Sequence, residues 1–207
     1  MSINKQTEDY IRSRPSIKDC LKEGLINYSS LTRKISKEKG IKKFDAILIA
    51  CRRYKRKLGL EKSREKKIID ILKNSRLEIK NKIAVIVIEK PRYFDDLIEL
   101  QKKIKKQRSE FHLIEGQEVM NIITNEEFIP LIEEVFKNKI IKINKDLVEI
   151  VLVVDERIES TSGVIAYVYS LLGDNDVNIV EEMSCWTDVL VVIDEDDLAK
   201  AMGLLKF

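Results

Sequence analysis

The last sixty residues carry the pattern that most limits how this chain can fold. Residues 148–154 form a short apolar run rich in β-branched side chains, which is typical of a buried strand. Apolar side chains then recur at helical spacing after Gly163, as they do along an amphipathic helix. The predicted order is strand 148–154, helix 164–172, strand 177–180, strand 189–193 and helix 196–205.

The middle of the chain, residues 82–143, repeats this order. Residues 119–128 are similar to residues 189–198, seventy positions later, because an apolar strand runs into an acidic helix start in both. The repeat predicts two βαββα units within an α+β fold. The first unit has a further strand at 140–143, whereas the second reaches Phe207 without a fourth strand. Because an open sheet edge favours pairing with another chain, we expect a homodimer.

Residues 146–207 resemble an ACT domain, the small-molecule-sensing module of amino-acid metabolism, and especially the paired ACT modules of aspartokinases. The likeness rests on the loop at Gly163, the passage 174–179 and the apolar strand 189–193. Two features depart from the family: many ACT domains have Pro-Gly where this chain has Ser162-Gly163, and the fourth strand is missing. The resemblance implies two ferredoxin-like βαββα(β) units and a small amino acid as effector. The sequence shows no nucleotide-binding kinase portion.

The loop at Gly163 is the best candidate for a ligand site. Gly163 lets the backbone approach a ligand closely, and the N–H groups of residues 163–165 lie unpaired at a helix start, which suits a carboxylate. The resemblance implies further contacts from the second strand, and an acidic side chain that meets the ligand's amine. The candidate residues are Asp155, Ser162, Gly163, Val164, Ile165, Asp174, Asn178 and Ile179.

A purely structural role for these residues is the alternative. In that interpretation Gly163 only closes a tight turn, and Asn178 only caps a strand. The middle unit has Lys90-Pro91-Arg92 at the corresponding place. It lacks the glycine, so we expect that unit to support the structure without binding a ligand.

Charge is divided unevenly along the chain. Residues 1–80 contain 23 Lys and Arg against 10 Asp and Glu, whereas residues 81–207 contain 15 against 25. A basic region joined to an acidic one predicts separate domains, of which the first faces a polyanion. The predicted domains are 1–80, 81–145 and 146–207. The alternative is that the two regions neutralise each other within one compact particle.

The basic region is predicted to be helical. Asn27 and Gly40 bound a helix that resembles the second helix of winged-helix proteins, and residues 42–58 give the longest helix, apolar on one side and basic on the other. Such helices fit a helix-turn-helix domain on double-stranded DNA, with residues 76–80 as a wing strand or a linker. A solvated basic face is the alternative. The candidate DNA-binding residues are Ser29, Ser30, Arg52, Arg53, Arg56 and Lys57.

Several classes of function are not expected. No apolar run reaches the ~18 residues of a membrane span, and the N-terminus lacks a signal-peptide core, so we expect a cytoplasmic protein without a membrane partner. The only histidine, His112, is predicted to lie on a strand surface. The acidic run 194–197 suits a helix start better than a metal. With no glycine-rich phosphate loop or catalytic constellation, we expect no enzyme activity, cofactor or metal.

These patterns together predict an amino-acid-sensing regulatory protein. Its ACT-type module binds a small amino acid and controls the basic N-terminal domain, which contacts DNA or a partner. The alternative is a regulatory or structural subunit of an amino-acid-metabolic enzyme that binds no ligand itself.

Overall fold

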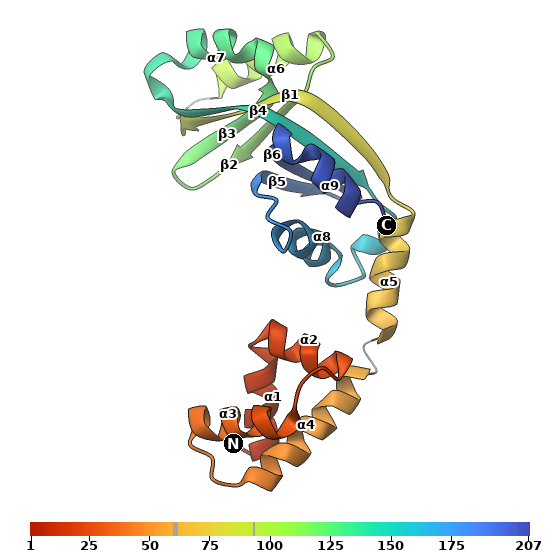
Figure 1. Ribbon diagram of the computed structural model, residues 1–207. Helices are drawn as coiled ribbons and strands as arrows, with labels where there is room; N and C mark the ends of the chain where they lie inside the picture. The colour runs from red at the N-terminus through yellow and green to blue at the C-terminus, as the bar shows by residue number, and fades with distance from the viewer. Residues whose placement is uncertain (60–61, 93) are drawn as a thin grey trace. The chain divides into compact units, whose positions relative to one another are not determined.

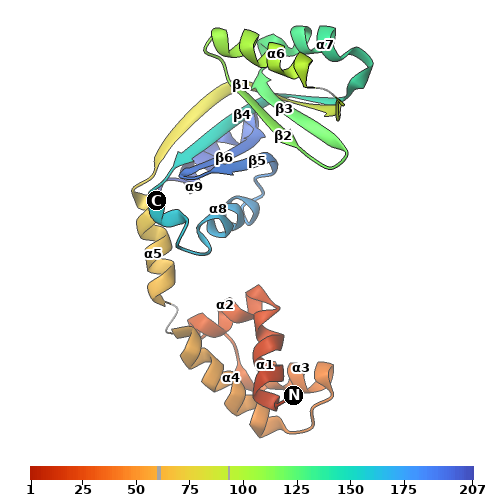
Figure 2. The ribbon, with the colours of Figure 1, turned by 180° about the vertical axis from the view of Figure 1, so that it is seen from behind.

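The structure is a computed structural model that describes residues 1–59, 62–92 and 94–207 (Figure 1). The chain divides into two compact units, Met1–Lys67 and Ile68–Phe207. Figure 2 shows the same elements from behind. Across the described ranges, no helix combines the length and the apolar character needed to cross a membrane.

The second unit begins earlier than the predicted domain boundary at residue 80. Helix α5 (Lys62–Lys73) contributes Ile68, Ile71 and Leu72 to the core of this unit, where all three are buried. Burying these apolar side chains ties the second half of α5 to the unit that follows it. The boundary therefore lies inside a helix that the sequence assigned to the basic domain.

Besides the beginning of α5, the described part of the first unit contains four helices. They are α1 (Ile3–Arg12), α2 (Pro15–Glu23), α3 (Tyr28–Lys39) and α4 (Phe44–Gly59). The Asn27 side chain accepts a hydrogen bond from the Ser30 N–H at 3.0 Å and so caps α3, as predicted. Gly40 ends α3 in the left-handed conformation, with φ of 66°, which also confirms the prediction.

The core of the first unit forms along the apolar side of α4. Ile47, Cys51 and Leu58 are fully buried there and pack with Ile11 and Ile35. Burial raises the pKa of the Cys51 thiol to about 11, so this cysteine behaves as an inert apolar side chain. The predicted apolar stripe of the longest helix is thus the centre of this unit.

The second unit is a six-stranded antiparallel sheet with helices on its outer faces. The strand order is β2-β3-β1-β4-β6-β5. The elements are β1 (Arg76–Glu89), α6 (Asp95–Lys106), β2 (Phe111–Glu115), β3 (Val119–Asn125), η1 (Glu126–Phe128), α7 (Ile129–Phe136), η2 (Lys137–Lys139), β4 (Ile140–Val153), η3 (Glu156–Ile158), α8 (Val164–Gly173), β5 (Ile179–Cys185), β6 (Asp188–Asp194), η4 (Glu195–Asp197) and α9 (Leu198–Leu204).

Strands β1 and β4 are each shared by both halves of this sheet. The end of β1, residues 83–89, pairs with β3, while its beginning, residues 76–80, pairs with residues 149–153 of β4. Strand β4 is also divided between the halves. Its residues 140–147 pair with the end of β1 in the first half, and its residues 147–153 pair with β6 in the second. Each half therefore receives its fourth strand from the other, as the long curved β1 and β4 in Figure 1 show.

This exchange corrects three predictions from the sequence. The second unit does not lack a strand, since residues 76–80 supply it from the N-terminal side. The same residues are neither a wing nor a linker. The predicted boundary between residues 145 and 146 falls within β4. The missing strand was the reason for expecting a homodimer, so self-association stays a prediction without that support.

A bulge marks the point where each shared strand passes from one half to the other. Lys82 in β1 has φ of 55° and Asp146 in β4 has φ of 57°. A non-glycine residue rarely adopts this left-handed conformation, which here bends the strand. The Asp146 N–H donates to the Glu126 side chain at 2.8 Å, and Lys82 Nζ lies 3.4 Å from Glu195. These polar contacts hold both bends in place.

The two halves pack through their helix-free faces. In Figure 1, α6 and α7 cover the outer side of the first half, and α8 and α9 cover the outer side of the second. Between the halves lies an apolar cluster of five buried residues, Ile83, Val85, Ile123, Leu147 and Val192. The sheet is therefore bent into two layers around a third core, in addition to the two cores beneath the helices.

Candidate functional site

A hollow of about 240 Å³ lies at the beginning of α8. Gly163 precedes the helix with φ of 99°, a conformation that glycine adopts without strain. The first N–H groups of an α-helix have no carbonyl partner within it, and the positive end of the helix dipole lies there. This combination suits a small anionic group such as a carboxylate. The hollow is lined by Ile158, Thr161, Ser162, Gly163, Val164, Ile165 and Ala166.

Four predicted ligand residues, 162–165, line this hollow together. Asp155 belongs to the same connection but is already paired. Its carboxylate accepts a hydrogen bond from the Arg157 backbone N–H at 2.9 Å and lies 2.7 Å from Arg157 Nε. The Arg157 hydrogen bonds lower the pKa of Asp155. A ligand amine at Asp155 has to compete with this arginine.

The other three predicted ligand residues lie elsewhere. Asp174 directly follows α8, at the opposite end of a ten-residue helix from Gly163. Asn178 and Ile179 line a separate hollow of about 510 Å³ beside the first half of β4. Ile179 pairs with Ile193 and so lies near the point where β4 enters the second half, whereas Gly163 follows the end of β4. Within one chain, the eight predicted residues do not form one site.

The predicted DNA-binding arginines are exposed on α4. Arg52, Arg53 and Arg56 lie outside the apolar stripe of this helix, on its solvent side. The Arg52 guanidinium is 6.0 Å from the centre of the Tyr28 ring, which is within the range of a cation–π contact. Lys57 Nζ lies 2.7 Å from a Glu8 carboxylate oxygen, so part of its charge is neutralised.

The first turn of α3, which contains the candidates Ser29 and Ser30, begins beside Arg52. Tyr28 begins α3, and its ring faces Arg52. Ser30 is exposed, whereas Ser29 is half-buried. Of the predicted residues, Arg52 lies beside α3, and Lys57 is paired with Glu8.

A charged cluster on the helix-free face of the second unit was not predicted. Lys80 Nζ lies 3.0 Å from a Glu110 carboxylate oxygen and 3.1 Å from a Glu149 oxygen. His112 Nε2 lies 3.1 Å from the other Glu149 oxygen. The Glu149 side chain is fully buried, and His112 is largely buried, with 21% of its side chain exposed. As predicted, His112 lies on a strand, but its side chain is only partly exposed because it packs beside Glu149.

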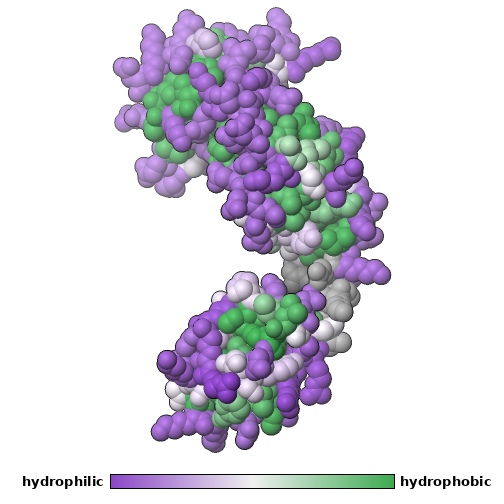
Figure 3. Space-filling view, in the orientation of Figure 1, coloured by the Kyte–Doolittle hydropathy of each residue, from purple (hydrophilic) through white to green (hydrophobic). Residues whose placement is uncertain are grey.

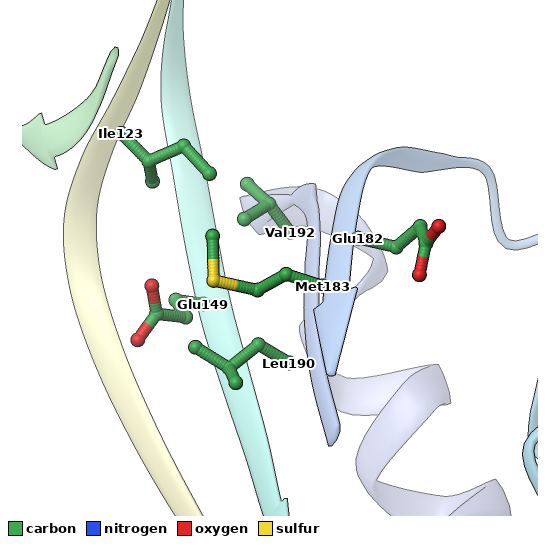
Figure 4. Close-up of a pocket in the computed structure, with 6 residues that line it drawn as sticks. All are labelled: Ile123, Glu149, Glu182, Met183, Leu190 and Val192. Carbon is green, nitrogen blue, oxygen red and sulfur yellow. The ribbon is translucent and has the colours of Figure 1, made fainter. Parts of the chain in front are cut away.

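Glu149 keeps its charge in this buried place because of its neighbours. Burial raises the pKa of this carboxyl, but His112 and Lys80 outweigh burial and lower it. Figure 4 shows Glu149 beside Met183, Leu190 and Val192, which point into the space between the sheet halves. That space is too narrow for a water molecule, so solvent does not compensate the charge on this side.

The sequence contains a signal for this cluster. Glu149 is the one charged residue inside the apolar run 148–154, and a buried strand rarely carries such a residue without a partner. Its partners come from β1 and from the start of β2, which are distant in sequence. Lys80 approaches Glu149 as its cross-strand partner, and His112 approaches it because the sheet bends; no local pattern reveals either contact.

Solved structures that resemble the chain include aspartokinases and their subunits. The aspartate kinase of Clostridium acetobutylicum matches at 18% identity and a TM-score of 0.53, over 63% of this chain and 33% of that one. The alpha and beta subunits of an aspartokinase match at 16% identity and a TM-score of 0.50, over 62% of this chain and 93% of that one. The regulatory subunit of aspartate kinase from Thermus flavus matches at 14% identity and a TM-score of 0.50, over 62% of this chain and 94% of that one.

The second unit has an ACT-like fold. At 14–18% identity the likeness shows the fold alone, and the chain spans about a third of the length of the C. acetobutylicum enzyme. No protein-family model matches the chain, and the comparison with curated proteins gives no match. The resemblance read from residues 146–207 is thus supported at the level of fold.

The two ACT-like halves differ at the loop after their first strand. In the first half, Lys90-Pro91-Arg92 lines a hollow of about 420 Å³ together with Glu89, Asp96 and Lys139. Asp95 and Asp96 occupy the first turn of α6, where they already satisfy the helix dipole and repel an anion. The Gly163 loop of the second half has no acidic residue in the first turn of its helix.

Proposed function

We propose that the protein is an amino-acid-responsive regulatory protein. In this proposal the second half of the ACT-like unit binds a small amino acid at the Gly163 loop, and binding changes what the basic first unit contacts. The observation that carries the proposal is the hollow at the beginning of α8, with its left-handed glycine. The fold shared with aspartokinase regulatory subunits supports the regulatory role by analogy.

The lining of the hollow offers groups for a ligand carboxylate and no charged side chain for a larger charged ligand. No Lys, Arg, Asp or Glu is among the seven residues that line it. In this proposal a ligand carboxylate is bound by backbone N–H groups and by the Thr161 hydroxyl. Its volume of about 240 Å³ accommodates only a small molecule.

A thermal-unfolding screen of the twenty amino acids tests this function. One ligand at a hundred times its Kd should stabilise the second unit by about 2.7 kcal/mol. In Gly163→Val, the branched side chain fills the loop and should abolish binding to that ligand in calorimetry. Gly173→Ala, at the other end of α8, is the matched control and should bind normally. If Gly163→Val binds with unchanged affinity, the site is elsewhere.

DNA is the second candidate for what the protein contacts. The exposed arginines on α4, next to the first turn of α3, favour it. If this surface contacts phosphates, log–log plots of affinity against salt should have a slope of about −0.9 per neutralised phosphate. Changing both Arg52 and Arg56 to Ala should reduce the magnitude of the slope by about two units.

A matched charge change in the other unit controls for net charge. Lys103 and Lys106 lie in the last turn of α6, and changing both to Ala removes the same two charges. This variant should keep the salt slope of the unchanged protein. If the full chain binds no duplex DNA at low salt, with or without amino acids, the basic surface contacts a protein instead.

A further inference from the structure

Three potential metal ligands converge on the helix-free face of the second unit. Glu110 directly precedes β2 and His112 lies two residues later within it, while Glu149 comes from the middle of β4. One ligand atom from each lies within 4.8 Å of the other two. His112 Nε2 is 3.1 Å from a Glu149 oxygen and 3.5 Å from a Glu110 oxygen. These separations are close to those between neighbouring ligands of one ion with bonds of about 2.0–2.2 Å.

Two of these atoms are buried and lack a hydrogen-bond partner. They are His112 Nε2 and the Glu149 Oε2 that faces it. Although 3.1 Å apart, they do not meet the geometry of a hydrogen bond with each other. Lys80 contacts the other oxygen of Glu149, so Oε2 faces His112 Nε2 without a hydrogen bond. A fully buried carboxylate oxygen without a partner costs free energy, and a cation between it and the imidazole removes that cost.

We propose that Glu110, His112 and Glu149 bind one divalent first-row transition ion of the Zn²⁺ class. The candidate site is empty in this structure. An imidazole nitrogen with carboxylate oxygens suits Zn²⁺ and its neighbours better than Mg²⁺ or Ca²⁺, which prefer oxygen alone. Glu110 and His112 keep 24% and 21% of their side chains exposed, so the cluster lies close to solvent on their side.

The ion has a structural consequence that follows from the topology. Glu110 and His112 belong to the first ACT-like half, and Glu149 belongs to the part of β4 that pairs with β6 in the second. Bound metal therefore links the two halves across their helix-free faces. Lys80 acts as a competitor, because its ammonium lies 3.0–3.1 Å from both carboxylates. The site shares no residue with the Gly163 hollow, so metal binding and amino-acid binding can be tested independently.

Titration of the full chain with Co²⁺ and with Zn²⁺ tests the site. Co²⁺ should give visible absorption bands of a nitrogen- and oxygen-ligated ion, and Zn²⁺ should displace it and raise the melting temperature. His112→Asn and Glu110→Gln should each weaken binding at least about tenfold, as losing even an outer partner does. Glu115→Gln, on the same strand but paired with Lys90, is the control and should bind normally.

Lys80→Met distinguishes a metal site from a plain ion-pair network. Removing the competing ammonium should tighten metal binding, whereas in a network without metal it only destabilises the fold. The proposal is overturned if the unchanged protein gives no Co²⁺ bands and no Zn²⁺-dependent shift in melting temperature. It is equally overturned if folded His112→Asn, verified by circular dichroism, binds the metal with unchanged affinity.

Discussion

The two ACT-like halves of the second unit share a topology but differ in their first helices. Helix α6 has seven charged residues among its twelve, whereas the ten residues of α8 include none. Both helices bury three residues against the sheet, so the inward face follows the same rule in each. In Figure 3, green patches lie over the region of α8 and α9. The two halves therefore share the fold that their strands determine, and they differ in the outer helix and in the loop that precedes it.

The loops and the inner face show the same contrast. The second half has Gly163 at φ 99° where the first has Lys90-Pro91-Arg92. Glu149 lies three residues after the bulge at Asp146 in β4, and Val85 lies three residues after the matching bulge at Lys82 in β1. At this matching position on the helix-free face, β4 therefore has a buried carboxylate where β1 has an apolar side chain. Chemistry that can bind a ligand is thus concentrated on the second half and on its contact with the first.

The largest expected effect tests whether the halves fold as one body. Ile86 in β1 and Ile150 in β4 occupy matching positions, and both are fully buried. Changing either to Ala should cost about 2–5 kcal/mol, because each leaves a cavity in a packed core. Because the shared strands join the halves, both halves should unfold in a single transition. Each variant should lower the urea concentration at the midpoint of that transition, as measured by hydrogen exchange. Unfolding of one half while the other keeps its protected amides would show that they are independent.

Removing the buried charge should have the next largest effect. Glu149→Gln should lower the free energy of unfolding at pH 7 by about 3 kcal/mol, because Lys80 and His112 lose a buried partner. The folded-state pKa of Glu149 is lowered, so its contribution is present above the unfolded value of about 4.3 and is lost as pH falls through the folded value. Urea unfolding of both proteins from pH 7 to pH 3 should show their difference shrinking on acidification.

Glu181 is the matched control for that pH dependence. It lies on β5 of the same face and accepts a hydrogen bond from the Asn121 side chain. Burial raises the pKa of Glu181, so its neutral form is favoured in the folded state. Compared with Glu181→Gln, the unchanged protein should therefore lose stability as pH rises above about 4.3, the opposite direction to Glu149. Equal slopes for both variants would contradict the different surroundings assigned to these two carboxyls.

The two ends of α8 should respond differently to the same small change. Gly163→Ala should cost about 1–3 kcal/mol, because its left-handed φ strains a residue with a Cβ. At Gly173→Ala an added Cβ meets open space and no positive φ, so stability should change little or rise by about 0.4–1 kcal/mol. Thermal unfolding of both variants measures the difference. Equal effects would mean that the conformation of Gly163 is not required.

The smallest expected effect concerns the hairpin of the second half. Trp186 has φ of 53° and is 65% exposed, so its ring contributes little packing. Asn tolerates this conformation better, and Trp186→Asn should change stability by less than about 1 kcal/mol, in the stabilising direction. Chemical denaturation checks this. A loss above 2 kcal/mol would indicate that the ring is buried in an assembly.

Local patterns in the sequence were enough to predict the order of elements in both halves. The repeat between 119–128 and 189–198 reappears as β3 with η1 and β6 with η4, and Asp194 caps η4 as expected for the acidic run. Local spacing determines such elements, because side-chain periodicity reports on one face at a time.

Long-range pairing was beyond the reach of the sequence. Residues 76–80 pair with a strand about seventy positions later, and nothing in their own pattern identifies that partner. The same limit explains why Asn178 and Gly163 were placed in one site, although α8 and β4 hold them apart. The cluster of Glu110, His112 and Glu149 was missed because these residues meet only when the sheet bends.

The proposed sensor is tested most directly by backbone-amide NMR during titration with the amino acid that gives the largest thermal shift. The amides of Gly163, Val164 and Ile165 should shift in proportion to occupancy, because they donate to the ligand carboxylate. Those of Lys90 and Arg92, at the corresponding loop of the first half, should stay in place. Shifts at residues 90–92 with none at 163–165, or no binding by any of the twenty amino acids, would contradict the proposal.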